Sequence, residues 1–185
     1  MINDTIKTIM NRRSIRTFKP DQVEEDKLEI MMTAAQYAPN AGGRQLWNFT
    51  IVQNKEVLEN IVLRMVKALG ESENKDHQKR AANPNYHTFY HAPTVIIVSG
   101  VESTIMIETD CAAATENMLL AAESLGLSTC WVGSASLVLS REDIKRSLGI
   151  PDGYKPLYAV SVGYNSSLEK IEPTHRKPNT VNYVR

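Results

Sequence analysis

The sequence predicts an α+β domain of three layers, in which a central sheet carries helices on both faces. Four short apolar runs, at residues 48–53, 95–98, 129–132 and 157–162, read as buried strands. Segments with helical periodicity separate these runs. No GxGxxG or GxxxxGK[ST] motif follows a strand, which removes the main support for a Rossmann or P-loop domain.

The first half of the chain contains three predicted helices. Residues 2–10 form a short one, because apolar side chains recur at helical spacing and Asn3 or Asp4 can cap it. Apolar residues at helical spacing from Val23 to Ala35 mark a second helix, which stops before Pro39. A glycine-containing loop over residues 40–45 leads into the first strand, and an amphipathic helix at 56–69 follows that strand.

The second half begins with residues 70–87, which are polar, charged and aperiodic and predict a flexible excursion or lid. Residues 109–125 form a long helix that is apolar around nearly its whole circumference, as expected at the centre of a fold or in a subunit interface. Ser140 and Asp143 suggest a capping box for a helix that ends at Gly149. The tail at 165–185 is polar and is expected to be extended.

Composition narrows the function classes. The 185 residues, 42% of them hydrophobic, suffice for one full core, and we see no repeat, linker or boundary, so residues 1–185 are expected to form one domain. Lysine plus arginine equals aspartate plus glutamate at 21 each, which argues against a nucleic-acid or membrane-surface binder. The two cysteines, Cys111 and Cys130, fit reduced core thiols. The N-terminus lacks a signal-peptide pattern, and no apolar run is long enough to span a bilayer, so we expect a cytoplasmic protein.

The segment at residues 12–16, RRSIR, is the strongest functional signal. It places three guanidinium groups and a hydroxyl within five residues, directly after the first predicted helix. Guanidinium groups offer planar, forked donors that suit phosphate. A near-neutral protein with such a local cluster fits a small anionic ligand, although a solvated basic turn accounts for this segment equally well when it is taken alone.

Five segments, in order, resemble the flavin-dependent nitroreductase family: residues 12–16, 38–47, 110–120, 125–134 and 160–164. The resemblance implies a three-layer α-β-α fold with a mostly antiparallel sheet, and an obligate homodimer that holds two FMN molecules in its interface. It further implies that NAD(P)H reduces the flavin, and that a small-molecule acceptor such as a nitroaromatic or quinone then takes the electrons in a ping-pong cycle. The flavin carries the chemistry, so no catalytic side chain is expected.

The same resemblance assigns two groups of basic residues to the cofactor. Arg12 and Ser14 would lie at the phosphate and ribityl end, with Arg13 nearby, and Arg16 would reach the N1/O2 edge of the ring. Arg176 and Lys177 match the second phosphate clamp of the family. For Arg13 a surface ion pair is an almost equal alternative.

Two further segments complete the implied site. A loop from Pro39 to Gln45 would reach across the dimer to the other flavin, with contacts from Pro39, Asn40, Ala41, Gly43 and Gln45. Asn40, Gly43 and Leu46 differ from the usual residues, which leaves the hydrogen bonds of this loop open. Trp131, Val132 and Gly133 would pack along one face of the ring and direct a main-chain N–H toward N5, whereas Trp47 is expected in the core.

Other readings stay open. A same-fold enzyme specialised for reductive dehalogenation or flavin fragmentation, a flavin-binding sensor or storage protein, and a non-flavin interaction module are the alternatives. Lys75, Lys79 and Arg80 either contact the extra phosphate of NADPH or are solvated. His87 and His91 are four residues apart, but no third ligand is recognisable near them in the sequence, so no metal site is predicted.

Overall fold

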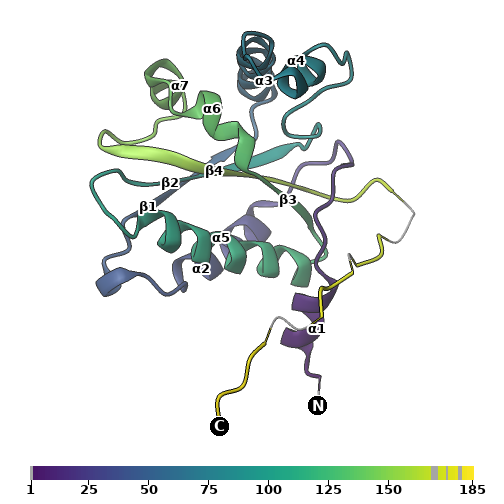
Figure 1. The fold of residues 1–185 in the computed structure, drawn as a ribbon, viewed down its shortest axis with the longest axis vertical. Coiled ribbons are helices and arrows are strands. Elements are labelled where there is room, and N and C mark those ends of the chain that lie inside the picture. The colour runs from purple at the N-terminus through teal and green to yellow at the C-terminus, as the bar shows by residue number, and fades with distance from the viewer. Residues whose placement is uncertain (1, 168–170, 174, 179–180) are drawn as a thin grey trace.

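A computed structural model describes residues 2–167, 171–173, 175–178 and 181–185. Its centre is a four-stranded sheet with the order β1-β2-β4-β3, and every neighbouring pair is antiparallel. The strands are β1 (Trp47–Val52), β2 (Thr94–Val101), β3 (Ser128–Val132) and β4 (Tyr154–Gly163). The predicted three-layer arrangement is confirmed, because helices cover both faces of this sheet (Figure 1).

One face packs on α2 (Glu25–Gln36) and α5 (Ile107–Ser124) (Figure 1). The small residues Ala114 and Ala122 let α5 approach the sheet closely, while Met31 from α2 and Met118 from α5 fill the space between the helices; all four are fully buried. The long apolar helix predicted from the sequence is therefore the central helix of this layer. The short helix α1 (Asp4–Asn11) follows its Asn3 cap, whose Oδ1 accepts from the N–H of Ile6.

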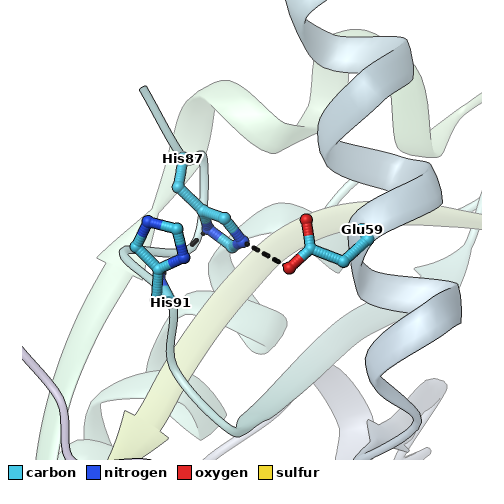
Figure 2. A group of neighbouring side chains, drawn as sticks. All are labelled: Glu59, His87 and His91. Carbon is cyan, nitrogen blue, oxygen red and sulfur yellow. Dashed lines mark hydrogen bonds and ion pairs between the residues drawn. The ribbon is translucent and has the colours of Figure 1, made fainter. Parts of the chain in front are cut away.

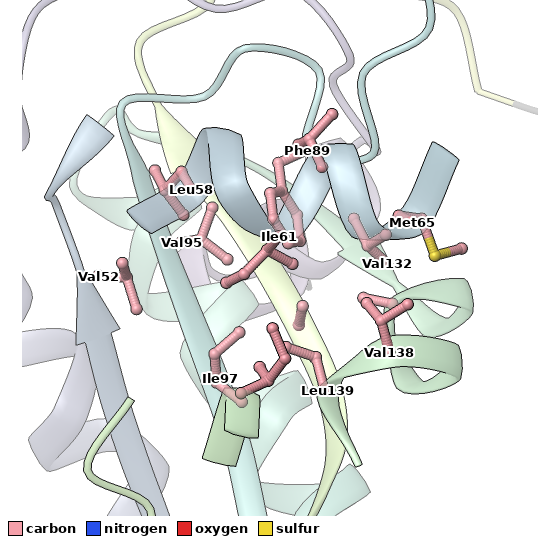
Figure 3. Close-up of a cluster of buried hydrophobic side chains, with 14 of the residues drawn as sticks. Val52, Leu58, Ile61, Met65, Phe89, Val95, Ile97, Val132, Val138 and Leu139 are labelled. Carbon is pink, nitrogen blue, oxygen red and sulfur yellow. The ribbon is translucent and has the colours of Figure 1, made fainter. Parts of the chain in front are cut away.

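The other face packs on α3 (Lys55–Gly70), α6 (Ser136–Leu139) and α7 (Glu142–Ser147), with α4 (Lys75–Ala81) beside α3. Figure 3 shows how side chains from α3, β2 and α6 meet in this core around Phe89. Phe89 is fully buried although it lies outside any helix or strand. The segment that leads into β2 is thus anchored directly in the core.

Two expectations from the sequence are wrong in detail. Residues 75–81 form α4, capped by Asn74 and held to Ser72, whose main-chain oxygen accepts from the Gln78 amide at 2.9 Å. The capping box at Ser140 and Asp143 is absent: the Ser140 hydroxyl bonds Ser136 O, and Asp143 pairs with two arginines. The Ser140 hydroxyl thus bonds the main chain of the preceding turn, and the pairing of Asp143 with Arg64 of α3 is a tertiary contact that local spacing does not reveal.

Cys111 and Cys130 are buried and unpaired, and burial raises the pKa of the Cys111 thiol to about 12. The protonated thiol therefore acts as a small core side chain. Within the described ranges, no helix combines the length and hydropathy that crossing a membrane requires.

Gly100→Ala is expected to destabilise the fold by about 1–3 kcal/mol, the usual cost of overpacking a core. An added Cβ at Gly100 would lie 2.1 Å from Ile107 Cγ1 and 3.1 Å from Cys111 Sγ. Gly70→Ala is the matched control, since its Cβ would make an ordinary 3.8 Å contact with Ala81. Urea unfolding of the two variants tests this expectation, and equal midpoints would contradict it.

Candidate flavin site

The segment from Arg12 to Arg16 lies along the outer edge of the sheet. Because β3 is the last strand in the order, its outer edge pairs with no other strand of the sheet, and Ser14 forms a parallel bridge there with Thr129. The N–H of Ile15 donates to Thr129 O at 2.9 Å, and the Ile15 side chain is buried. The strand-like path leaves Ser14 and Arg16 exposed.

Arg12 carries a buried polar atom that has no hydrogen-bond partner in the described part of the chain. Its Nε is enclosed, and the nearest carboxylate oxygen, Glu116 Oε1 on α5, is 3.6 Å away. A buried guanidinium N–H without a hydrogen bond is costly. The geometry therefore favours a strong acceptor near Arg12, and an anionic ligand would supply one.

Arg13 is engaged differently. Its Nη1 donates to Met10 O and Arg12 O at 2.7 and 2.8 Å, and its Nε donates to Ile171 O at 3.2 Å. These bonds tie the C-terminal tail to the end of α1, which brings the tail that carries Arg176 and Lys177 past the arginine cluster. The described contacts give Arg13 a structural role. Contacts of Arg13, Arg176 and Lys177 with a phosphate remain predictions.

Arg16 borders a cavity of about 550 Å³. Its guanidinium carbon lies 5.8 Å from the centre of the Tyr90 ring. The Tyr90 side chain raises the pKa of Arg16, which therefore stays charged. The other lining residues come from the end of α4, the turn before β2 and the end of β3: Arg80, Asn83, Asn85, Tyr86, His87, Thr88, Tyr90, His91 and Ser134. Sequence reasoning missed most of this wall, because residues 80–91 lack a recognisable period.

The chain at the end of β3 meets the same cavity through Ser134. Val132 is 5% exposed and belongs to the core, so only its main chain can face a ligand. The half-buried Trp131 packs edge-on against Tyr158, with ring centres 4.7 Å apart, and the exposed Gly133 begins a tight turn. The predicted packing of Trp131, Val132 and Gly133 along a flavin ring remains a prediction.

The loop from Pro39 to Gln45 lies on the opposite side of the protomer from the arginine cluster (Figure 1). Its polar groups bond internally or to α5: Asn40 Oδ1 accepts from the N–H of Gln45 at 2.9 Å, and Asp110 Oδ1 accepts from the N–H of Ala41 at 3.1 Å. Gly43 adopts a left-handed φ of +65°. One protomer therefore does not bring this loop to Arg12, Ser14 and Arg16.

His87 and His91 have a neighbour that the sequence did not reveal. Glu59 on α3 lies with its Oε1 3.6 Å from His87 Nε2, so the fold brings in an acidic group that is distant from both histidines in the sequence (Figure 2). The two imidazole rings are 4.0 Å apart between centres. Together these side chains offer three atoms within 4.8 Å of one another, a spacing compatible with metal ligation.

The hydrogen bonds of His87 argue against ligation. Its Nδ1 accepts from the main-chain N–H groups of Phe89 and His91, at 3.2 and 3.1 Å. The neutral ring must then carry its proton on Nε2, where it faces Glu59. A metal bound to Nε2 would leave the proton of the neutral ring on Nδ1. Nδ1 could then no longer accept the two main-chain N–H hydrogen bonds. The arrangement favours a hydrogen-bonded turn over a metal centre.

Comparison with known proteins places this geometry in a family. The model described as the nitroreductase family matches residues 9–164. A protein of Archaeoglobus fulgidus, provisionally named an NADH dehydrogenase/NAD(P)H nitroreductase, is 30% identical over 167 residues, covering 88% of this chain and 86% of that protein.

Solved structures of nitroreductases are also similar to this chain. An FMN-bound nitroreductase from Bacteroides fragilis is 33% identical, with a TM-score of 0.92 over 99% of this chain and 100% of that one. An FMN-bound nitroreductase from Desulfitobacterium hafniense is 27% identical, with a TM-score of 0.91 over the full length of both chains. With the matched segment extending over most of the chain, this protein belongs to the nitroreductase family.

Proposed function

We propose that this protein is an FMN-dependent oxidoreductase that passes electrons from NAD(P)H to a small acceptor, such as a nitroaromatic or a quinone, by a ping-pong mechanism. The observation that carries the proposal is the buried Arg12 Nε, which lacks a hydrogen bond in the described part of the chain. The related structures from Bacteroides fragilis and Desulfitobacterium hafniense contain FMN, a cofactor whose phosphate would pair with such a group.

The residues present fit this cofactor. Arg12 would bind the phosphate, the exposed hydroxyl of Ser14 would bind beside it, and Arg16 would keep a positive charge at the cavity that the nicotinamide and the acceptor enter in turn. When bound, FMN would supply the hydride and electron chemistry. The protein would bind and orient the reactants, and no side-chain nucleophile is required.

We also propose a homodimer. The helix α1 buries none of its residues within the protomer. Its apolar side chains Ile6, Ile9 and Met10, together with Ile2 just before it, are between 41% and 61% exposed. An apolar helix face of this kind favours association with another chain. A two-fold partner would also supply the loop from Pro39 to Gln45, which one protomer holds far from its own arginine cluster (Figure 1).

A cytoplasmic location is part of the proposal. The two buried thiols, Cys111 and Cys130, are unpaired, which suits a reducing compartment.

The visible spectrum of the purified protein, before and after anaerobic addition of NADH or NADPH, tests the main proposal. Flavin bands that bleach with either nucleotide, and that return when menadione or a nitrofuran is added, are expected. A flavin spectrum that bleaches with neither nucleotide would favour a sensor or storage role. Colourless protein that takes up no added FMN would overturn the proposal.

Arg16→Ala is expected to lower the flavin reduction potential by about 30 mV, which for a two-electron couple corresponds to losing about 1.4 kcal/mol of preference for the reduced state. The reduced flavin carries more negative charge, so a nearby guanidinium stabilises it preferentially. Anaerobic redox titration measures the potential, and Arg16→Lys should retain most of it. An unchanged potential in the alanine variant would place Arg16 away from the ring.

A further inference from the structure

The cavity beside Arg16 is strongly cationic. Two of its lining residues, Arg16 and Arg80, carry guanidinium groups, and Asn83, Asn85 and Tyr86 add neutral polar groups. Among the described residues that line it, none is an aspartate or a glutamate. In a protein of zero net charge, such an imbalance is a local feature that attracts anions.

Arg80 is available to a ligand. It lies in the last turn of α4 and is exposed, and within the described ranges no carboxylate, carbonyl or aromatic ring engages its guanidinium. Its neighbour Lys79 is instead paired with Asp76 at 3.5 Å. An arginine at a cavity wall without an internal partner retains its full capacity for bidentate binding of a carboxylate or a phosphate.

The backbone that carries Arg80 is held in place. The N–H of Asp76 donates to the Asn74 cap, and the Ser72 hydroxyl bonds His77 Nδ1 at 2.9 Å. At the other end, Ala81 packs against the core that α3 shares with the sheet. Arg80 is therefore presented to the cavity by a capped helix docked on α3, a better support for specific recognition than a free loop.

We propose that Arg80 is a specificity-determining residue that binds an anionic group, a carboxylate or a phosphate, on a substrate in this cavity. The inference rests on the proposed function, which already assigns Arg16 to the cofactor and leaves Arg80 for the substrate. Two sources of the anion share this chemistry: an acceptor that carries a carboxylate, and the additional phosphate that distinguishes NADPH from NADH. The cavity volume of about 550 Å³ suits a single aromatic acceptor.

The test compares Arg80→Gln with the wild-type protein and with Arg146→Gln, an exposed arginine in the last turn of α7 that does not line this cavity. The acceptors are 4-nitrobenzoate and its neutral methyl ester, each measured with NADH as kcat/KM. Because the ratio of the two acceptors is compared between variants, their different intrinsic reactivities cancel. Calorimetry adds the binding of 4-nitrobenzoate, NAD⁺ and NADP⁺ to the FMN-loaded, oxidised protein.

In Arg80→Gln, kcat/KM or affinity for the anionic ligand is expected to fall about tenfold relative to that for its neutral or less charged counterpart. This is the scale for removing one partly exposed charged hydrogen bond. Arg80→Lys should restore part of the loss, and Arg146→Gln should show none. A loss confined to 4-nitrobenzoate assigns the site to the acceptor, and a loss confined to NADP⁺ assigns it to the nucleotide.

The inference would be overturned if Arg80→Gln changed neither the ratio of 4-nitrobenzoate to its methyl ester nor the ratio of NADP⁺ to NAD⁺ affinity. The proposed function fails separately, if the wild-type protein does not turn over the neutral ester with either nucleotide. In that event the calorimetric titrations still decide whether Arg80 binds the anion, since they require no turnover.

Discussion

Arg12→Ala is expected to weaken FMN binding by about a hundredfold, a loss of roughly 3 kcal/mol, the upper range for a hydrogen bond to a charged group. The wild-type Nε is buried and lacks a hydrogen bond in the described chain, so the phosphate would be its strongest partner. The dissociation constant follows from the fluorescence quenching of FMN titrated with apoprotein. Arg12→Lys should give an intermediate value, because it keeps the charge and loses the planar fork.

Glu116 supplies a control with the opposite sign. Its carboxylate lies 3.6 Å from Arg12 Nε and competes with the phosphate for the same charge. Glu116→Gln should therefore tighten FMN binding, with an effect smaller than that of Arg12→Ala because Glu116 is 47% exposed and water screens the pair. Unchanged affinity in Arg12→Ala, or weaker binding in Glu116→Gln, would contradict a phosphate site at Arg12.

Most of the fold could be predicted because its elements carry strong local signals. The predicted helix at 56–69 corresponds to α3 at Lys55–Gly70, where apolar residues recur every three to four positions and Asn54 caps the start. The predicted strand at 95–98 is the centre of β2, which is buried on both faces and therefore reads as an uninterrupted apolar run. In such elements the pattern of residues indicates both the type of secondary structure and which side is buried.

The elements that escaped prediction depend on distant partners. The helix α4 carries few apolar residues and is held by Asn74, Ser72 and its contact with α3. The four-residue helix α6 is too short to show a period, and its Val138 and Leu139 fill the core above the sheet (Figure 3). In both cases tertiary packing decides the structure.

In the candidate site, too, features with a local sequence signal could be predicted and features that depend on tertiary contacts could not. The cluster at Arg12 to Arg16 could be found because three basic residues lie within five positions. The cavity wall at residues 80–91 and the pairing of His87 with Glu59 could not, since they arise only when α3 and the turn before β2 pack together. The loop from Pro39 to Gln45 is singled out by its resemblance to the family, and the contact with FMN that is proposed for it would require a second chain.

His87→Gln is expected to destabilise the protein by about 2–4 kcal/mol, because it removes the Nδ1 acceptor and leaves the N–H groups of Phe89 and His91 unpaired. These bonds hold a turn in which Tyr90 and His91 have φ of +56° and +57°, a conformation that costs free energy in non-glycine residues. His87→Asn is the matched variant. Its Oδ1 can occupy the position of Nδ1, so it should retain most of the stability while losing the contact with Glu59. Urea unfolding distinguishes the two, and equal losses would show that the Nδ1 bonds do not hold the turn.

The same contacts give the protein a defined pH dependence. Burial lowers the pKa of His87 and the adjacent His91 lowers it further, while Glu59 opposes both effects. The unfolded chain therefore binds a proton near the ordinary histidine value of about 6.5, where the folded chain does not. This contribution to stability is complete above about pH 6.5 and is lost as the pH falls toward the lower pKa of the folded state. The free energy of unfolding should thus decrease more in the wild type than in His87→Asn between about pH 7.5 and about pH 5, since Glu59 and His91 are present in both. Equal decreases would mean that His87 can accept a proton without breaking the turn, and that its Nδ1 is not committed to the main chain.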